Sequence, residues 1–156
     1  KCIIGPSTVL LRRDIYTAAG GFREDLPVAE DYELWLHITA RYAAGYIDQP
    51  LIEKRAGHGE QLSEKWGAIE YFRLRALLDF LGYHTAMPAP PGLPVLHPDQ
   101  TRSITGASRL PVDLLQQAEA ELERKLRVFA KGAAKRGYTD ITAWCDRQGW
   151  KQPDQG

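Results

Sequence analysis

Apolar residues recur at helical spacing in four stretches of the chain, and this pattern predicts a structure rich in helices. Helices are expected over about residues 30–45, 63–82, 111–136 and 139–148, each closed by a glycine or a polar turn. The third and longest helix is amphipathic and carries a regular apolar seam, which is typical of packing against a neighbour. The seam consists of Leu115, Ala118, Leu122, Leu126, Phe129 and Ala133.

Short runs with the composition of β-strands lie outside these helices. Residues 8–11 (TVLL) suit a sheet strand entered from a bend, and residues 46–47 and 51–52 read as two short extended pieces. Asp14 is predicted to be the N-cap of a further short helix, and Gly20 is placed to stop that helix in a left-handed conformation. Strands and helices together predict an α/β first part.

Five prolines between residues 88 and 98 exclude a long helix and predict an extended connector. Beyond it, Glu121 with Lys125 and Glu123 with Arg127 have the i,i+4 spacing of ion pairs on the outer side of the long helix. The chain is therefore predicted to have three parts, which are residues 1–85, a connector over 86–110 and a helical extension over 111–156.

Composition and charge narrow the class of protein. Twenty basic and twenty acidic residues give zero formal charge, so no overall field recruits nucleic acid. Cys2 and Cys145 lack the spacing of a disulfide scaffold or a zinc site and predict free thiols in a reducing compartment. No apolar run reaches the roughly 18 residues of a membrane span. We expect a cytoplasmic protein, with peripheral membrane contact as an option, and we expect the chain to be a piece of a longer one.

Candidate chemistry gathers at the start of the first long helix, at Glu30 and Asp31. The positive end of a helix favours ionised carboxylates there, as a base needs, but first-turn acids also simply complement the dipole. Neighbouring positions point about 100° apart, so the two acids cannot do the same job. His58 lies in a glycine-flanked loop after Arg55. Four interpretations of this histidine stay open: a metal ligand, a phosphate contact, a general acid or a merely solvated side chain.

Five short motifs, taken in order, resemble the C-terminal half of family-two glycosyltransferases. These are inverting enzymes of the GT-A type, which pass a sugar from a nucleotide-diphosphate donor to an acceptor hydroxyl. The likeness covers roughly the first 63 residues and depends on the order of the motifs. The motifs are PSTVLLRR at 6–13, AGGF at 19–22, AEDYELWL at 29–36, IDQPL at 47–51 and Arg55-x-x-His58-x-x-x-x-Ser63.

The resemblance implies roles for residues at the acceptor. Asp31 matches the aspartate of the family's Glu-Asp motif, which implies that it deprotonates the acceptor hydroxyl. Glu30 would orient Asp31 or bind the acceptor. Gly20 and Gly21 match a flexible acceptor-binding loop beside the acceptor. The implied acceptor is a glycan, a lipid or a protein.

On the donor side, His58 matches a histidine that helps hold a divalent metal, Mg or Mn, and Arg55 is a weaker candidate for the donor diphosphate. The chain lacks the Asp-x-Asp of the nucleotide-binding half and the Gln-x-x-Arg-Trp of processive synthases. We therefore expect a partial enzyme, inactive alone and holding no metal by itself.

The resemblance also sets the expected fold class, an α/β part of a GT-A domain followed by an α-helical extension of a kind seen on some bacterial members. A different class of function stays open: the seam of the long helix suits a helical interaction or homo-oligomerisation module without catalysis. A third and weaker reading is a metal hydrolase that uses Glu30, Asp31 and His58.

Overall fold

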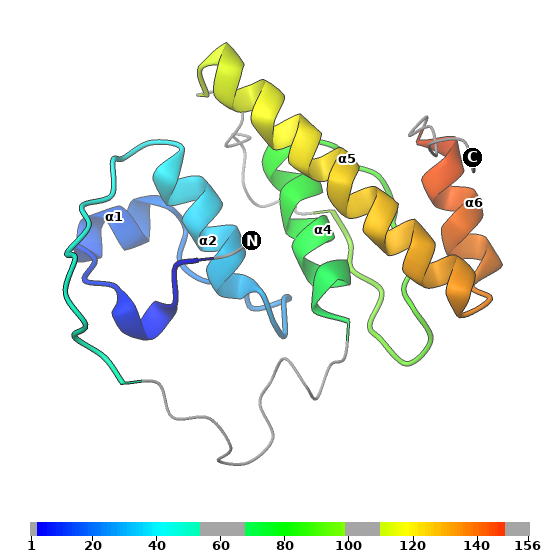
Figure 1. Cartoon of the computed structure of the whole chain (residues 1–156), viewed down its shortest axis with the longest axis horizontal. Helices are drawn as coiled ribbons and strands as arrows, with labels where there is room; N and C mark the ends of the chain where they lie inside the picture. Colours follow the sequence, from blue (N-terminus) through cyan, green and yellow to red (C-terminus); the bar gives the residue numbers. More distant parts are fainter. Residues whose placement is uncertain (1–2, 54–67, 99–109, 149–156) are drawn as a thin grey trace.

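The computed structural model describes residues 3–53, 68–98 and 110–148, and within these residues every regular element is a helix (Figure 1). Helices α2, α4, α5 and α6 pack each against the next, so that α4 lies between α2 and α5. The elements are a 3-10 turn η1 (Pro6–Thr8) and the helices α1 (Arg13–Ala18), α2 (Glu30–Thr39), α4 (Ile69–Leu81), α5 (Val112–Lys135) and α6 (Thr139–Arg147).

The predicted α/β class is wrong for this chain, because the described residues contain no strand and an α/β domain needs a central sheet. Residues Pro6–Thr8 form the 3-10 turn. Val9 after it is extended, but it pairs with no described strand. The pieces at 46–47 and 51–52 are also irregular, and Tyr46 is 85% exposed. β-rich composition favours an extended backbone, but a strand exists only where a second strand accepts and donates its hydrogen bonds.

Helix ends follow the predicted signals in part. Gly20 takes the left-handed conformation after α1, with φ 87°, as predicted. Asp14 is not the N-cap of α1, because the helix begins at Arg13 and Arg12 is the capping residue. Asp14 lies in the first turn instead, where its carboxylate accepts hydrogen bonds from the Arg12 guanidinium. Helix α2 ends at Thr39, short of the predicted end at residue 45.

The second half of the chain keeps closer to the prediction. Helix α4 ends at Gly82, whose φ of 81° is left-handed, and its predicted first residues lie outside the described part. Helices α5 and α6 begin and end within about two residues of the predicted bounds, which is the usual uncertainty of a helix end. Among the described residues, no helix is both long enough and apolar enough to cross a membrane.

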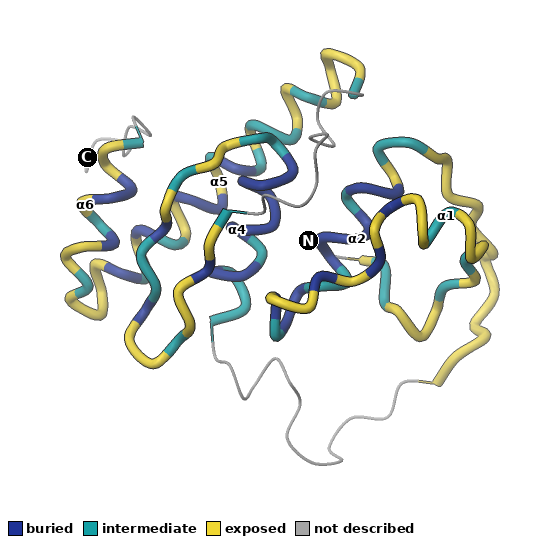
Figure 2. The backbone as a smooth tube through the Cα atoms, turned by 180° about the vertical axis from the view of Figure 1, so that it is seen from behind, coloured by how far each residue is buried: buried dark blue, intermediate teal, exposed yellow. Residues whose placement is uncertain are grey.

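The hydrophobic core forms two clusters on opposite sides of α2. The smaller cluster joins Leu34, Trp35 and Ile38 of α2 to Ala19 and to the chain around α1. The larger cluster begins at Tyr32 and continues through α4, α5 and α6. Figure 2 shows the buried backbone along α4 and the exposed backbone that follows α2. Helix α2 is therefore held from both sides.

The proline-rich stretch after α4 packs back onto that helix. Met87 and Leu96 are buried in the larger cluster. The hydroxyl of Tyr71 donates to the carbonyl of Pro94 at 3.1 Å and accepts the N–H of Leu96 at 3.2 Å.

Cys145 of α6 is a buried free thiol, as predicted, and burial raises its pKa to about 11. Cys2 lies outside the described residues.

A buried ionic network ties the loop before α2 to α4. The Asp79 carboxylate accepts from Arg23 Nη1 at 2.6 Å and from Arg75 Nη2 on the preceding turn of α4. All three side chains are at most 7% exposed. The Arg75 guanidinium also donates to the carbonyls of Tyr83 and Thr85, which fixes the exit from α4. The Asp79 carboxylate thus bridges two buried cations, of which Arg23 is also paired with the carboxylate of Asp25, at 2.9 Å through Nε.

Replacing Asp79 by alanine would leave both guanidinium groups buried without that carboxylate. We expect the free energy of unfolding to fall by about 3–5 kcal/mol, as it does when one partner of a buried ion pair is removed. Urea denaturation followed by circular dichroism measures the change. The matched control is Asp14→Ala, which removes an exposed carboxylate paired with Arg12 and leaves the urea midpoint unchanged. Equal midpoints for the two variants would contradict this account of the network.

Candidate functional site

The start of α2 carries the acidic pair that the sequence singled out, on an unusual backbone. Ala29, the N-cap, has φ 66° and ψ 15°, and within the described residues it is the non-glycine residue with a positive φ. Its side chain is buried in the larger cluster. A left-handed residue with a Cβ costs about 1–2 kcal/mol, so packing must hold this turn in place. Strain of this kind recurs at functional sites.

Glu30 and Asp31 occupy the first turn of α2 and are half-buried. Asp31 Oδ1 accepts the backbone N–H of Tyr32 at 2.7 Å, which is its polar contact within the described part of the chain. Glu30 makes no polar contact with another described residue. The pair therefore presents carboxylate oxygens next to the positive end of a helix.

Gly20 and Gly21 belong to a turn that packs on α1. Both have left-handed φ values, 87° and 68°. The Gly21 N–H donates to the carbonyl of Tyr16, and a Cβ on Gly21 would lie 3.1 Å from the Tyr16 hydroxyl. The Phe22 N–H donates to that hydroxyl as well. The structure does not bring these glycines into hydrogen-bonding contact with the Asp31 carboxylate, so their acceptor role stays a prediction.

The donor-side candidates Arg55 and His58 lie outside the described residues. Within the described residues, no group of three or more histidine, cysteine or acidic side chains is arranged to hold a metal ion. The side chains that can be placed therefore do not make a metal site. The metal, the diphosphate contact and the hydrolase reading stay predictions.

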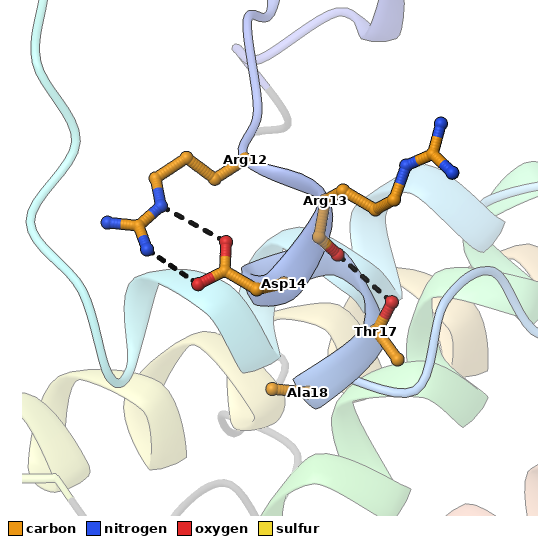
Figure 3. Close-up of a pocket in the computed structure, with 5 residues that line it drawn as sticks. All are labelled: Arg12, Arg13, Asp14, Thr17 and Ala18. Atoms are coloured by element: carbon orange, nitrogen blue, oxygen red, sulfur yellow. Dashed lines mark hydrogen bonds and ion pairs between the residues drawn. The ribbon is translucent and has the colours of Figure 1, made fainter.

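A surface depression over α1 is a second place to look for a site, and its geometry does not favour one (Figure 3). Arg12 and Asp14 on its wall form a bidentate pair, and Arg12 lowers the pKa of Asp14 through that hydrogen bond. The Thr17 hydroxyl donates to the carbonyl of Arg13 at 3.0 Å. These side chains are exposed, and their polar groups bond to neighbouring residues of the same short segment. Such local contacts are common on protein surfaces and do not indicate a binding site.

Behind the acidic pair, α2 carries two further ionisable side chains in the protein interior. Glu33 is 0% and His37 2% exposed, and His37 Nε2 lies 3.0 Å from Glu33 Oε1. The His37 ring meets the ring of Phe80 on α4 edge to face, with centroids 5.4 Å apart. The contact between His37 and Phe80 joins α2 to α4 and so helps to set the rotation of α2 about its axis, and with it the directions in which Glu30 and Asp31 point.

Lys125 of α5 contacts residues of both α2 and α4 near the start of α2. It lies 5.5 Å above the centre of the Tyr32 ring, and its ammonium group donates to Glu70 of α4 at 2.7 Å. Burial alone would raise the pKa of Glu70, but hydrogen bonds from Lys125 and Arg73 outweigh it and lower that pKa. The side chain that follows Asp31 is thus held by a cation on α5.

Sequence reasoning missed these interior ionic groups or placed them wrongly. The predicted ion pair of Lys125 with Glu121 is confirmed, at 3.7 Å, but Lys125 is 3% exposed and therefore does not lie on the outer side of the long helix. The second pair, Glu123 with Arg127 at 2.9 Å, is confirmed. A local signal was present for one of these pairs: Glu33 and His37 stand among the apolar residues of α2 at the i,i+4 spacing that lets one side chain reach the other.

Comparison of the chain with protein-family models, with curated proteins and with solved structures found no match. The likeness to family-two glycosyltransferases and the residue roles that it implies therefore stay predictions.

The pairing of Glu70 gives stability a defined pH dependence. Its folded-state pKa lies below the ordinary 4.5, so the pairing stabilises the fold above the unfolded-state pKa and is lost as pH falls through the folded-state pKa. Glu70→Gln should lower the free energy of unfolding at pH 7 and weaken its decline below about pH 4.5. Urea titrations at pH 3 to 7 measure both effects.

The control for Glu70→Gln is Glu123→Gln, because Glu123 is paired with Arg127 on the more exposed side of α5. We expect this control to follow the parent chain at every pH. Identical acid profiles for the parent and Glu70→Gln would show that Lys125 does not hold Glu70 ionised.

Proposed function

We propose that this chain supplies the acceptor side of an inverting glycosyltransferase, in which Asp31 is the general base. The reaction moves a sugar from a nucleotide-diphosphate donor to the hydroxyl of a glycan, lipid or protein acceptor. The observation that carries the proposal is the half-buried Glu30–Asp31 pair at the start of α2, fixed by the left-handed Ala29. The ordered motifs of the first 63 residues support the same reading.

In the proposed step, Asp31 takes the proton of the acceptor hydroxyl while the freed oxygen attacks the anomeric carbon. The bond from that carbon to the donor diphosphate breaks on the opposite face, so the configuration inverts and the proton ends on Asp31. The Tyr32 N–H holds Oδ1 of Asp31, which leaves Oδ2 as the proton acceptor. Glu30, pointing about 100° away, orients the acceptor or Asp31. No step of the proposal runs through a metal.

The proposed base is held by packing on several sides, as a catalytic group requires. Two core clusters hold α2, the His37 ring packs against Phe80 of α4, and Lys125 lies over Tyr32. A general base must stay within hydrogen-bond reach of its proton, so small displacements are costly. This support is what distinguishes the pair from ordinary first-turn acids.

The donor side of the reaction is proposed to lie with residues that are not among those described. The chain has no Asp-x-Asp, and Arg55 with His58 are its proposed contacts to the donor diphosphate and the metal. The helical fold found here replaces the α/β expectation and does not alter the role proposed for Asp31, since that role needs only a helix start and a held carboxylate.

The interaction-module function is not proposed, because the seam that suggested it faces other parts of the same chain. Leu122, Leu126 and Ala133 are buried in the larger cluster against α4 and α6. Homo-oligomerisation through this helix stays a prediction.

Asp31→Asn should reduce sugar transfer by about 10²- to 10⁴-fold in the natural protein that contains this chain, with donor affinity nearly unchanged, because a positioned base contributes that much. Donor turnover with a sugar acceptor and donor binding by calorimetry measure the two effects. Glu24→Gln, which alters an exposed acid in the preceding loop, is the matched control and should retain full turnover. Unchanged turnover for Asp31→Asn would remove the assignment of the base.

His58→Ala in the same protein should raise the concentration of Mg²⁺ or Mn²⁺ needed for half-maximal turnover by about tenfold or more, since a lost ligand or its support weakens metal binding by that amount. His84→Ala, in the exposed turn after α4, is the control and should leave the metal titration unchanged. A normal metal titration for His58→Ala would count against its role.

A further inference from the structure

An apolar groove lies on the part of the molecule formed by the start of α4, the proline turn, the end of α5 and the start of α6. Its volume is about 430 Å³, within the range of small-molecule sites. The residues that carry its apolar walls are Ile69, Pro90, Leu93, Phe129, Ala133 and Ile141. Neither Glu30 nor Asp31 contributes to it, so it is separate from the proposed base.

One wall of the groove includes a glycine inside α5. Gly132 lies in its wall, and a Cβ there would come within 3.0 Å of Arg136 Nη1. Val128, one turn earlier, leaves 51% of its surface exposed on the same wall. Glycine inside a helix is destabilising relative to alanine. Gly132 thus leaves the apolar groove accessible and lowers the stability of helix α5.

The free charge at the groove is positive. Arg136 Nη1 donates to the carbonyl of Gly132 at 3.0 Å, and among the described residues no carboxylate pairs with this guanidinium. Glu70, the acid on the opposite wall, already accepts from Arg73 and Lys125. A guanidinium with unused donors at the mouth of an apolar groove complements a phosphate or carboxylate attached to an apolar body.

We propose that this groove binds a small amphiphilic anion, with an alkyl or aryl body between Phe129 and Leu93 and a terminal phosphate or carboxylate at Arg136. The half-buried Phe129 ring gives the body a flat apolar surface, and the fully buried ring of Tyr71, stacked behind it with centroids 6.1 Å apart, holds that ring in place. The site stands independently of the proposed transferase function, since none of its residues takes part in that reaction.

Binding of octyl phosphate to the full 156-residue chain tests the site. Calorimetry below the micellar concentration should show one-to-one saturable binding. Gly132→Leu should weaken binding by at least about tenfold, because its side chain enters the groove. The variant should fold, since leucine favours helix over glycine and the nearest obstacle is the mobile end of Arg136.

Arg136→Gln should weaken octyl phosphate binding by about tenfold and leave the weaker binding of octanol unchanged, because only the phosphate uses the guanidinium. Arg127→Gln alters an arginine of α5 that is paired with Glu123 and does not line the groove, so it should bind as the parent does. No saturable binding, equal binding by Gly132→Leu, or association only with phosphatidic acid vesicles would each overturn the proposal.

Discussion

The charge balance at Asp79 is the interaction on which the arrangement of the helices depends. Two guanidinium groups are withdrawn from water, one from the loop before α2 and one from α4, and the Asp79 carboxylate lies between them and binds both, while Asp25 pairs with Arg23 as well. Burying either cation alone would cost several kcal/mol. Because Arg75 also binds the carbonyls after α4, the same centre sets the path of the proline-rich stretch and hence one wall of the groove.

How far the sequence predicts this fold depends on whether the information is local. The ends of α5 and α6 and the stop at Gly82 follow from apolar periodicity and left-handed glycines, which act within a few residues. The strand predicted at residues 8–11 failed because pairing is not local: Val9 is extended, but Thr8 belongs to the 3-10 turn and no described strand lies beside them. The length of α2 was overestimated for a related reason, since Tyr42 is exposed and no core holds it.

For the candidate site, the sequence located the acidic pair correctly at the start of a helix, because charge at helix ends is a local signal. It could not show the backbone of Ala29, since a positive φ at alanine arises from the packing of Val28, Ala29 and Tyr32 in the core. Nor could it show that Lys125 turns inward, because a lysine at i,i+4 from a glutamate is usually exposed. Here Tyr32 and Glu70 provide the partners that make burial possible.

The exposed segment after α2 also bears on how the chain behaves in solution. Tyr46, Ile47 and Leu51 are each more than 60% exposed on a backbone without strand pairing among the described residues. Such a segment offers open N–H and C=O groups together with apolar side chains, which is the template for edge-to-edge β association between molecules. Residues 46–52 contain one charge, Asp48, and one proline, Pro50, and residues of both types oppose such association, so the solubility of this chain depends on these two side chains.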